Sequence, residues 1–172
     1  MKFLLTAINA KYIHSNPGVY SLKIFAESQG AAEAVQGDQD PREDGLPCAP
    51  FVEIAEYTIN NQMELILEDI YRRKPDMVGI SCYIWNIAYA LDLVRDIHKV
   101  LPETDIWLGG PEVSYDAPQL LAREPEVFGV MKGEGEEMFA GLDEDPHQHL
   151  KLFDEKSNDE MVIVRDIPFS SM

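Results

Sequence analysis

The chain alternates between short apolar runs and longer segments in which apolar residues recur every three or four positions. Continuous apolar runs at residues 2–8, 77–82 and 105–110 have the length and character of strands buried on both faces of a sheet. Residues 51–59 alternate between apolar and polar side chains, and residues 127–133 form another apolar run that contains glycine. The pattern therefore predicts five β-strands.

The segments between these strands have helical spacing. Val19, Leu22, Phe25 and Ala26 share one face of a helix that we expect to end near Ser28. Similar spacing predicts helices over 63–71, over 87–101 and over 116–123, and a further helix that begins with "GEEMFAGL". Because a parallel strand pair needs a crossover connection, this alternation predicts a doubly wound, flavodoxin-like (Rossmann-like) α/β fold, with a five-stranded parallel sheet and helices on both faces.

Two segments lack this periodicity. Residues 30–50 are rich in Gly and Pro and are expected to form a flexible insertion. From residue 143 the composition becomes acidic and polar, and "MVIVRDIPF" near the end is expected to add one short edge strand. We therefore expect an α/β domain over 1–142 and an acidic linker or tail over 143–172 that leads out of a domain cut from a longer protein.

The net charge of −17 argues against nucleic acid or an anionic membrane surface as a partner, because both are bound through basic surfaces. The sequence contains no apolar run of membrane-spanning length and no secretory signal, so a cytoplasmic location is expected. Its two cysteines, Cys48 and Cys82, fit neither a disulfide framework nor a metal cluster, and Cys82 is expected to be a small buried apolar residue.

Polar residues and glycines follow the predicted strands. Because the carboxyl ends of parallel strands meet at one edge of the sheet, these residues are expected to lie together there. Glycines inside strands, such as Gly79 and Gly129, often mark the close approach of a ligand or of another backbone. The sequence therefore predicts a slot in the sheet, with a simple turn that needs positive φ as the alternative explanation for the paired glycines at 109–110.

Two common site types are not supported. The first strand is followed by no Gly-rich phosphate loop, and the acids of "GEGEE" would repel a phosphate, although they suit the first turn of a helix. Ser81 follows a strand, but "GISCY" is not a nucleophile elbow, and His98 is placed on a helix face. His147 and His149 lie in the acidic tail and could bind metal only weakly. The sequence contains no convincing catalytic constellation.

Four segments together resemble a known family. "NAKYIHSNPGVYSLK", "PDMVGISCYIWN", "IWLGGPEVSYD" and "VMKGEGEE" are similar to the N-terminal cobalamin-binding domain of radical S-adenosylmethionine enzymes, a group that includes anaerobic magnesium-protoporphyrin ester cyclases. The resemblance covers about residues 1–140, and "RDIPF" resembles the segment that leads into the radical domain. It implies that cobalamin binds base-off, with its dimethylbenzimidazole tail in a slot beside the sheet and its corrin ring on the loops.

The resemblance also implies a set of cofactor-binding residues. Gly109 and Gly110 would leave room for the tail, so that Gly110→Val would block the cofactor without disturbing the fold, and the Ser81 hydroxyl would hydrogen-bond at the mouth of the slot. The full set comes from the loops at one edge of the sheet: Asn9, Lys11, His14, Ser15, Asn16, Gly18, Ser81, Cys82, Tyr83, Gly109, Gly110, Pro111, Glu112, Gly133, Glu134 and Gly135.

The first loop departs from the methionine-synthase type, which carries D-x-H-x-x-G with the His as lower axial ligand. Asn9 and Lys11 stand where the Asp and His would be, and a protonated Lys11 cannot ligate cobalt. His14 is a possible cobalt ligand, and anchoring of the loop by hydrogen bonds is its alternative role.

The sequence has no C-x-x-x-C-x-x-C, so the 4Fe-4S cluster and S-adenosylmethionine of a parent methyltransferase or cyclase would belong to a missing C-terminal radical domain. The chain itself is expected to bind and position cobalamin without being catalytic. Two alternatives remain: a flavodoxin-like regulatory or interaction domain that has lost cofactor binding, and, less favoured, a hydrolase that uses Ser81.

Overall fold

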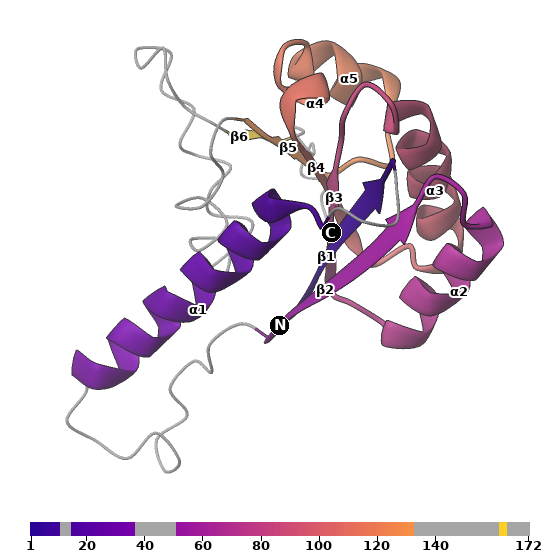
Figure 1. Ribbon diagram of the computed structural model, residues 1–172. Helices are drawn as coiled ribbons and strands as arrows, with labels where there is room; N and C mark the ends of the chain where they lie inside the picture. The colour runs from indigo at the N-terminus through magenta and orange to yellow at the C-terminus, as the bar shows by residue number, and fades with distance from the viewer. Residues whose placement is uncertain (11–14, 37–50, 133–161, 165–172) are drawn as a thin grey trace, which may run out of the picture.

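A parallel sheet forms the centre of the structure. The structure is a computed structural model, and it describes residues 1–10, 15–36, 51–132 and 162–164. Its strands are β1 (Lys2–Asn9), β2 (Phe51–Thr58), β3 (Met77–Ser81), β4 (Asp105–Gly109) and β5 (Gly129–Met131). They run parallel in the order β2-β1-β3-β4-β5 (Figure 1). This confirms the predicted doubly wound, flavodoxin-like fold.

A short sixth strand, β6 (Val162–Val164), pairs antiparallel with β5 and extends that edge of the sheet. It lies within the segment "MVIVRDIPF", so the predicted edge strand is confirmed. The rest of the predicted tail, and residues 37–50 of the predicted insertion, lie outside the described residues.

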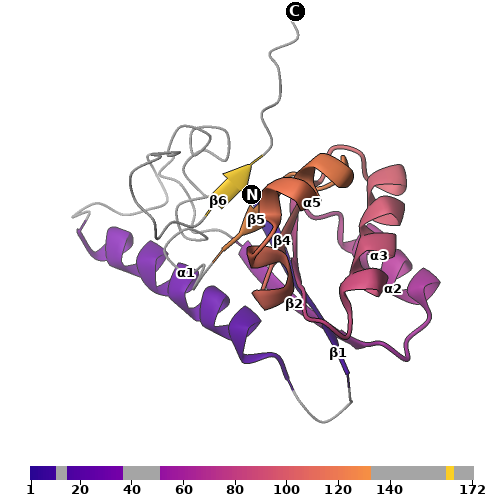
Figure 2. The same cartoon turned by 90° about the horizontal axis from the view of Figure 1, so that it is seen from above.

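Helices lie on both faces of the sheet (Figures 1 and 2). One face carries α1 (Pro17–Gln36). The helices on the other face are α2 (Met63–Arg73), α3 (Ile87–Val100), α4 (Pro111–Ser114) and α5 (Ala117–Arg123). Figure 2 shows α1 separated by the sheet from α2, α3 and α5.

The strand β1 shows how the apolar pattern builds this layered arrangement. Every residue from Phe3 to Ile8 is buried, as expected of a strand in the middle of a parallel sheet. Leu4 and Ile8 contribute to the apolar cluster beneath α2 and α3. Phe3, Leu5 and Ala7 point the opposite way and contribute to a second cluster, on the α1 side of the sheet. The side chains therefore alternate between two cores.

Two features differ from the sequence prediction. Helix α1 continues to Gln36, eight residues beyond the expected end near Ser28, so residues 30–36 are helical and do not belong to an insertion. The alanines in "GAAEAVQ" favour a helix through backbone propensity without an amphipathic pattern. The four-residue helix α4 was also not predicted, because so short an element has no detectable period.

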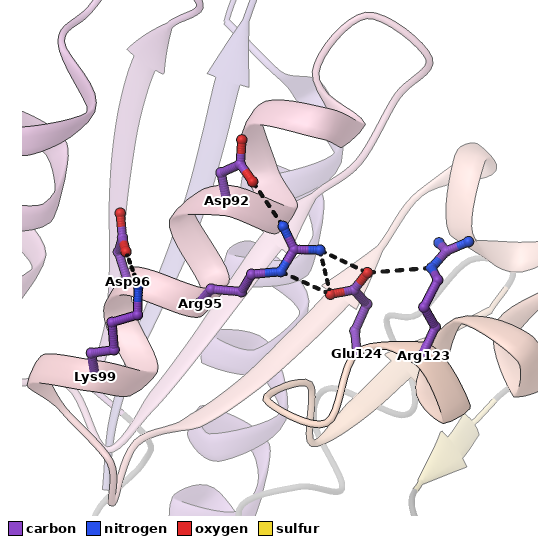
Figure 3. A network of polar contacts seen from close by, with 6 residues as sticks. All are labelled: Asp92, Arg95, Asp96, Lys99, Arg123 and Glu124. Carbon is purple, nitrogen blue, oxygen red and sulfur yellow. Dashed lines mark hydrogen bonds and ion pairs between the residues drawn. The ribbon is translucent and has the colours of Figure 1, made fainter.

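A group of charged residues fixes α3 to the connection between α5 and β5 (Figure 3). Arg95 of α3 donates from Nη2 to Glu124 Oε1 at 2.9 Å and from Nε to Oε2 at 3.1 Å. Glu124 directly follows α5, and its side chain is only 4% exposed. Asp92 and Arg123 add further contacts to this pair, so the buried carboxylate is well compensated.

Candidate functional site

The parallel register brings one row of residues together near the carboxyl edge of the sheet. Ala7 pairs with Ser81, and Ser81 pairs with Gly109. Glu56 on β2 and Met131 on β5 extend the row to both sides. Since residues of one row point the same way, all five face the α1 side. The expectation that Ser81 and Gly109 meet at one edge is confirmed.

Solvent reaches the sheet backbone one pleat below this row. Gly79 lies in the central strand β3 and is partly exposed, whereas its neighbours Val78 and Ile80 are buried on the α3 side. A Cβ atom at Gly79 would meet only Leu5 Cδ2 within 4 Å, at 3.1 Å. Ser81 and Gly109 are partly exposed as well, and we call the surface that these three residues form on the α1 side the Gly79 gap.

A pocket lies next to this gap, where the loops after β1 and β3 approach each other. Its volume is about 340 Å³, which is near the lower end for small-molecule sites. The rings of Tyr83 and Trp85 stack with centroids 4.5 Å apart and an angle of 6° between their planes. The lining combines apolar surface with two amide side chains: Asn9, Ala10, Ser15, Asn16, Pro17, Tyr83 and Trp85.

Asn16 connects the pocket to the Gly79 gap. Its side chain is buried, and Nδ2 donates to Ser81 Oγ at 2.9 Å. Its Oδ1 accepts a hydrogen bond from the backbone N–H of Gly18 at 3.0 Å, which caps the start of α1. The residue before α1 is thus fixed to the end of β3.

Glu56 holds the same loop from the side of β2. Its Oε1 accepts hydrogen bonds from Asn16 N at 2.9 Å and Asn9 Nδ2 at 3.2 Å, and its Oε2 accepts one from the Tyr20 hydroxyl at 2.9 Å. Burial would raise the pKa of Glu56, but the hydrogen bonds from Asn16, Tyr20, Asn9 and Ser15 outweigh it and hold this pKa below its ordinary value. Glu56 is therefore a carboxylate at neutral pH.

Asn86 shapes the loop that carries the two aromatic residues. Its side chain is buried, accepts from Tyr83 N at 2.7 Å and donates to the carbonyl oxygens of Ile8 and Ser81, each at 3.0 Å. A single amide thereby ties the loop after β3 to the end of β1, which fixes the position of the Tyr83–Trp85 pair.

The paired glycines have different structural roles. Gly110 has φ of 108°, and a Cβ atom there would overlap the carbonyl oxygen of Cys82. The turn itself requires this glycine, so the expectation that Gly110→Val would leave the fold undisturbed is wrong, while the expected contact of Gly110 with a ligand stays a prediction. At Gly109 a Cβ atom would make an ordinary contact with Met131 Cβ at 3.6 Å, so packing alone does not require a glycine there.

The other expected residues are placed as follows. Cys82 is fully buried in the core, and burial raises the pKa of its thiol to about 12, so its side chain does not reach the pocket. Pro111 and Glu112 open α4 beyond Gly110. Lys11, His14, Gly133, Glu134 and Gly135 lie outside the described residues.

The hydrolase alternative gains no support from the geometry. The Ser81 hydroxyl accepts a hydrogen bond from an amide, and His98 is exposed in the last turn of α3, at the opposite end of the sheet. The described residues also contain no group of three or more His, Cys, Asp or Glu side chains that could hold a metal ion. Within the same part of the chain, no helix is long and apolar enough to cross a membrane.

Sequence reasoning missed several residues of this site, Asn86 and Tyr20 among them. Ala10, Pro17 and Trp85 line the pocket, and Glu56 holds its loop. Trp85 lies in the quoted segment "PDMVGISCYIWN", so its neighbourhood was recognised although the residue was not. Glu56 had a weaker signal, an acid near the end of a half-buried strand.

Comparisons with known proteins relate the chain to two methyltransferases over part of its length. The chain is 34% identical over 68 residues to 2-(S-pantetheinyl)-carbapenam-3-carboxylate methyltransferase of Streptantibioticus cattleyicolor. It is 29% identical over 69 residues to the cobalamin-dependent radical SAM methyltransferase TokK of Streptomyces tokunonensis. Each match covers 40% of this chain but only 10% of the methyltransferase.

A second class of enzyme matches over a shorter stretch. The chain is 53% identical over 36 residues to GTP cyclohydrolase 1 of Geobacillus kaustophilus, which is 21% of this chain and 19% of that enzyme. So short a match does not establish membership of that family.

The fold resembles that of a solved cobalamin-dependent S-adenosylmethionine radical enzyme, OxsB, in its form with aqua-cobalamin and S-adenosylmethionine bound. The TM-score is 0.61 at 18% identity, over 87% of this chain and 19% of OxsB. The sequence model of the B12-binding domain matches residues 4–143, which is most of the chain. The chain therefore belongs to the B12-binding domain family and is related to the cobalamin-dependent radical S-adenosylmethionine enzymes.

Proposed function

We propose that the chain binds cobalamin base-off, with the nucleotide tail in the Gly79 gap and the corrin ring against the loops after β1 and β3. The observation that carries this proposal is that solvent reaches Gly79 in the central strand of the sheet, directly below Ser81 and Gly109. A flat heterocycle can enter only where side chains are absent, and glycines at 79 and 109 remove them from two neighbouring strands.

The residues around the gap fit such a tail chemically. Ser81 Oγ accepts a hydrogen bond from Asn16, which leaves its own proton available for a ring nitrogen of the base. Trp107 and Leu5 are buried on either side of Gly79 and would provide apolar walls. The expected hydrogen bond from Ser81 is thus compatible with the contacts already present.

The pocket would receive one edge of the corrin ring, because a corrinoid is larger than the pocket. Tyr83, Trp85 and Pro17 offer apolar surface, and the amides of Asn9 and Asn16 offer polar groups at its floor. Ile84, on the loop after β3, is 77% exposed, and Tyr115, between α4 and α5, is 92% exposed. These side chains would extend the apolar surface along the same edge.

The parent enzyme is proposed to be a radical S-adenosylmethionine methyltransferase or cyclase, whose C-terminal radical domain would hold S-adenosylmethionine and the 4Fe-4S cluster. When bound, cobalamin supplies a cobalt that can carry a methyl group, and this chain would hold and orient it. The relationship to the two methyltransferases supports this assignment.

The direct test is retention of the cofactor. The purified chain is mixed with hydroxocobalamin and passed through a gel-filtration column, and the visible spectrum of the protein peak is recorded. We expect co-elution with a base-off spectrum, and weaker retention of cobinamide, which has no nucleotide tail. A colourless protein peak would contradict the proposal and favour a flavodoxin-like domain that has lost its cofactor.

A second test addresses the lower face of the cobalt. Because Lys11 stands in the expected ligand position, we expect no nitrogen ligand below the cobalt. In an electron paramagnetic resonance spectrum of the cob(II)alamin form, a nitrogen ligand splits the cobalt lines into triplets. Triplets that disappear in His14→Ala would show that His14 is the ligand and that the base-off site is not open below the cobalt.

A further inference from the structure

We propose that Glu56 is a positioning residue for cofactor binding, which holds Asn9 and Asn16, at the two ends of the connection between β1 and α1, at the spacing that the pocket requires. The identity of the ligand rests on the proposed cobalamin function. The hydrogen-bond geometry around Glu56 is independent of that function. Glu56 does not itself line the pocket. It acts through residues that do.

Four donors converge on this one carboxylate: Ser15 and the three whose distances are given above. Asn9 ends β1, Asn16 immediately precedes α1, and Tyr20 lies in the first turns of that helix. Glu56 therefore joins both ends of the loop to β2, a strand that the loop does not connect. Because Asn9 and Asn16 are also pocket walls, the distance between these walls depends on Glu56.

The connection continues to the Gly79 gap. The backbone N–H of Asn16 donates to Glu56, and its side-chain amide donates to Ser81 Oγ. A shift of Asn16 would therefore move the group that fixes the Ser81 hydroxyl. Glu56 lies in the same row as Gly109, three strands away. Its contacts nevertheless hold Asn16 and, through Asn16, Ser81, and both residues are proposed to bind the cofactor.

An ionised carboxylate suits this position because it only accepts hydrogen bonds and all its partners donate. Hydrogen bonds to charged groups contribute more than those between neutral groups, and the donors left behind would lose a partner in a partly buried place. A truncated side chain at this position would release the loop ends from β2 without touching the apolar core.

Glu53 offers a matched control on the same strand. Its side chain points to the opposite face, where its carboxylate contacts Lys2 Nζ at 3.2 Å and Arg73 Nη1 at 2.9 Å. These contacts tie β2 to β1 and α2 and do not involve the loop. Glu53→Ala removes a hydrogen-bonded carboxylate of the same length and leaves the pocket walls as they are.

The experiment compares Glu56→Ala, Glu56→Gln and Glu53→Ala by titration with hydroxocobalamin, well below the melting temperature of each variant. We expect the dissociation constant to rise at least about tenfold for Glu56→Ala, which corresponds to about 1.4 kcal/mol. Glu56→Gln retains the Oε1 acceptor for Asn9 and Asn16, and the Tyr20 oxygen can accept from the new amide, so it should stay within about threefold of wild type. Glu53→Ala should also stay within that range, even if its melting temperature falls.

Wild-type affinity for hydroxocobalamin in Glu56→Ala would overturn the inference. Equal losses of affinity in Glu56→Ala and Glu53→Ala would also overturn it, because they would indicate a general effect on the fold. A defect in Glu56→Gln as large as in Glu56→Ala would overturn the proposed acceptor geometry.

A measurement without ligand separates this inference from the proposed function. Hydrogen exchange of the Asn16 backbone amide, followed by NMR in the apo protein, should accelerate in Glu56→Ala while amides of β1 and β3 remain protected. If wild type binds no cobalamin but this acceleration is found, the proposed function fails and the positioning role of Glu56 stands. Unchanged exchange at Asn16 would overturn the positioning role whether or not cobalamin binds.

Discussion

At the scale of single residues, the adjacent Gly109 and Gly110 differ in whether the fold itself requires a glycine. Gly110 has positive φ and lies against the Cys82 carbonyl, whereas Gly109 has ordinary backbone geometry and room for a Cβ atom. Only a glycine that packing does not require can report on space reserved for a ligand. Gly109 is that residue here.

We therefore expect opposite results from two alanine substitutions. Gly110→Ala should lower the free energy of unfolding by about 1–3 kcal/mol or more, because it adds a side chain in the left-handed region and against a carbonyl oxygen. Gly109→Ala should leave the free energy of unfolding nearly unchanged but weaken cobalamin binding. Urea unfolding of the apo proteins and titration with hydroxocobalamin measure the two effects. Unaltered cobalamin binding in Gly109→Ala would show that the nucleotide tail does not lie against the row of residues that contains Gly109.

The Cys82 thiol gives a second prediction at this scale. Burial, with a smaller contribution from the charge of Glu112, raises the pKa of this thiol to about 12. Since the thiolate is the reactive form, almost none is present at pH 8, and the side chain is inaccessible as well. Iodoacetamide at pH 8 should leave Cys82 unmodified in the native protein and alkylate it in denaturant, as judged by peptide mass spectrometry. Rapid alkylation of native Cys82 would show that the end of β3 opens.

The sequence could identify residues whose role depends on position along one strand, but not those whose role depends on contacts between strands. Ser81, Asn16 and Tyr83 were expected at the site because they follow predicted strands or lie in recognised segments. Glu56 was not, because its function depends on donors that are 36 to 47 residues away in the chain. For Gly110 the turn alternative was available, and the backbone geometry shows that the turn requires this glycine.

At the scale of elements, the apolar patterns were sufficient to predict all five parallel strands, because buried strands tolerate few polar residues. Elements without such a pattern were missed. The second half of α1 is alanine-rich and not amphipathic, and α4 is too short to show a period. Helix α3 shows the opposite case, because five of its residues are buried and repeat with helical spacing.

The packing of α3 can be tested at Leu91, which belongs to the apolar cluster beneath the helices and is 9% exposed. Leu91→Ala should lower the free energy of unfolding by about 2–5 kcal/mol, the range for truncation of a buried leucine. Leu65→Ala on α2 is the control, because that side chain is 56% exposed, and it should cost less than about 0.5 kcal/mol. Denaturant unfolding of both variants gives the comparison. A loss below about 1 kcal/mol for Leu91→Ala would mean that α3 packs in a different rotation.

At the scale of the whole molecule, the two apolar clusters on either side of the sheet account for the described fold without a contribution from a cofactor. The site lies instead on loops and strand ends at one edge, where the aromatic residues are exposed or partly exposed. This separation between a buried scaffold and an open edge is typical of α/β sheets that bind ligands at the carboxyl ends of their strands. The fold should therefore form first and bind the cofactor afterwards.

This order predicts cooperative unfolding of the apo chain and a melting temperature that rises with cobalamin concentration. A ligand that binds only the folded state stabilises it by about 2.7 kcal/mol at one hundred times its dissociation constant. For a chain of this size that corresponds to a rise of about 5–10 °C. Cobinamide at the same concentration should raise the melting temperature less, because it leaves the Gly79 gap empty.

The measurement is differential scanning calorimetry at moderate salt, which screens the repulsion that accompanies a net charge of −17. The Gly109→Ala protein should melt like wild type without ligand and gain less from cobalamin, while its gain from cobinamide stays the same. An apo chain without a cooperative transition would show that the cofactor completes the core. Equal gains from cobalamin and cobinamide in the wild-type protein would place the nucleotide tail outside the sheet, because a tail bound in the Gly79 gap makes contacts that cobinamide lacks.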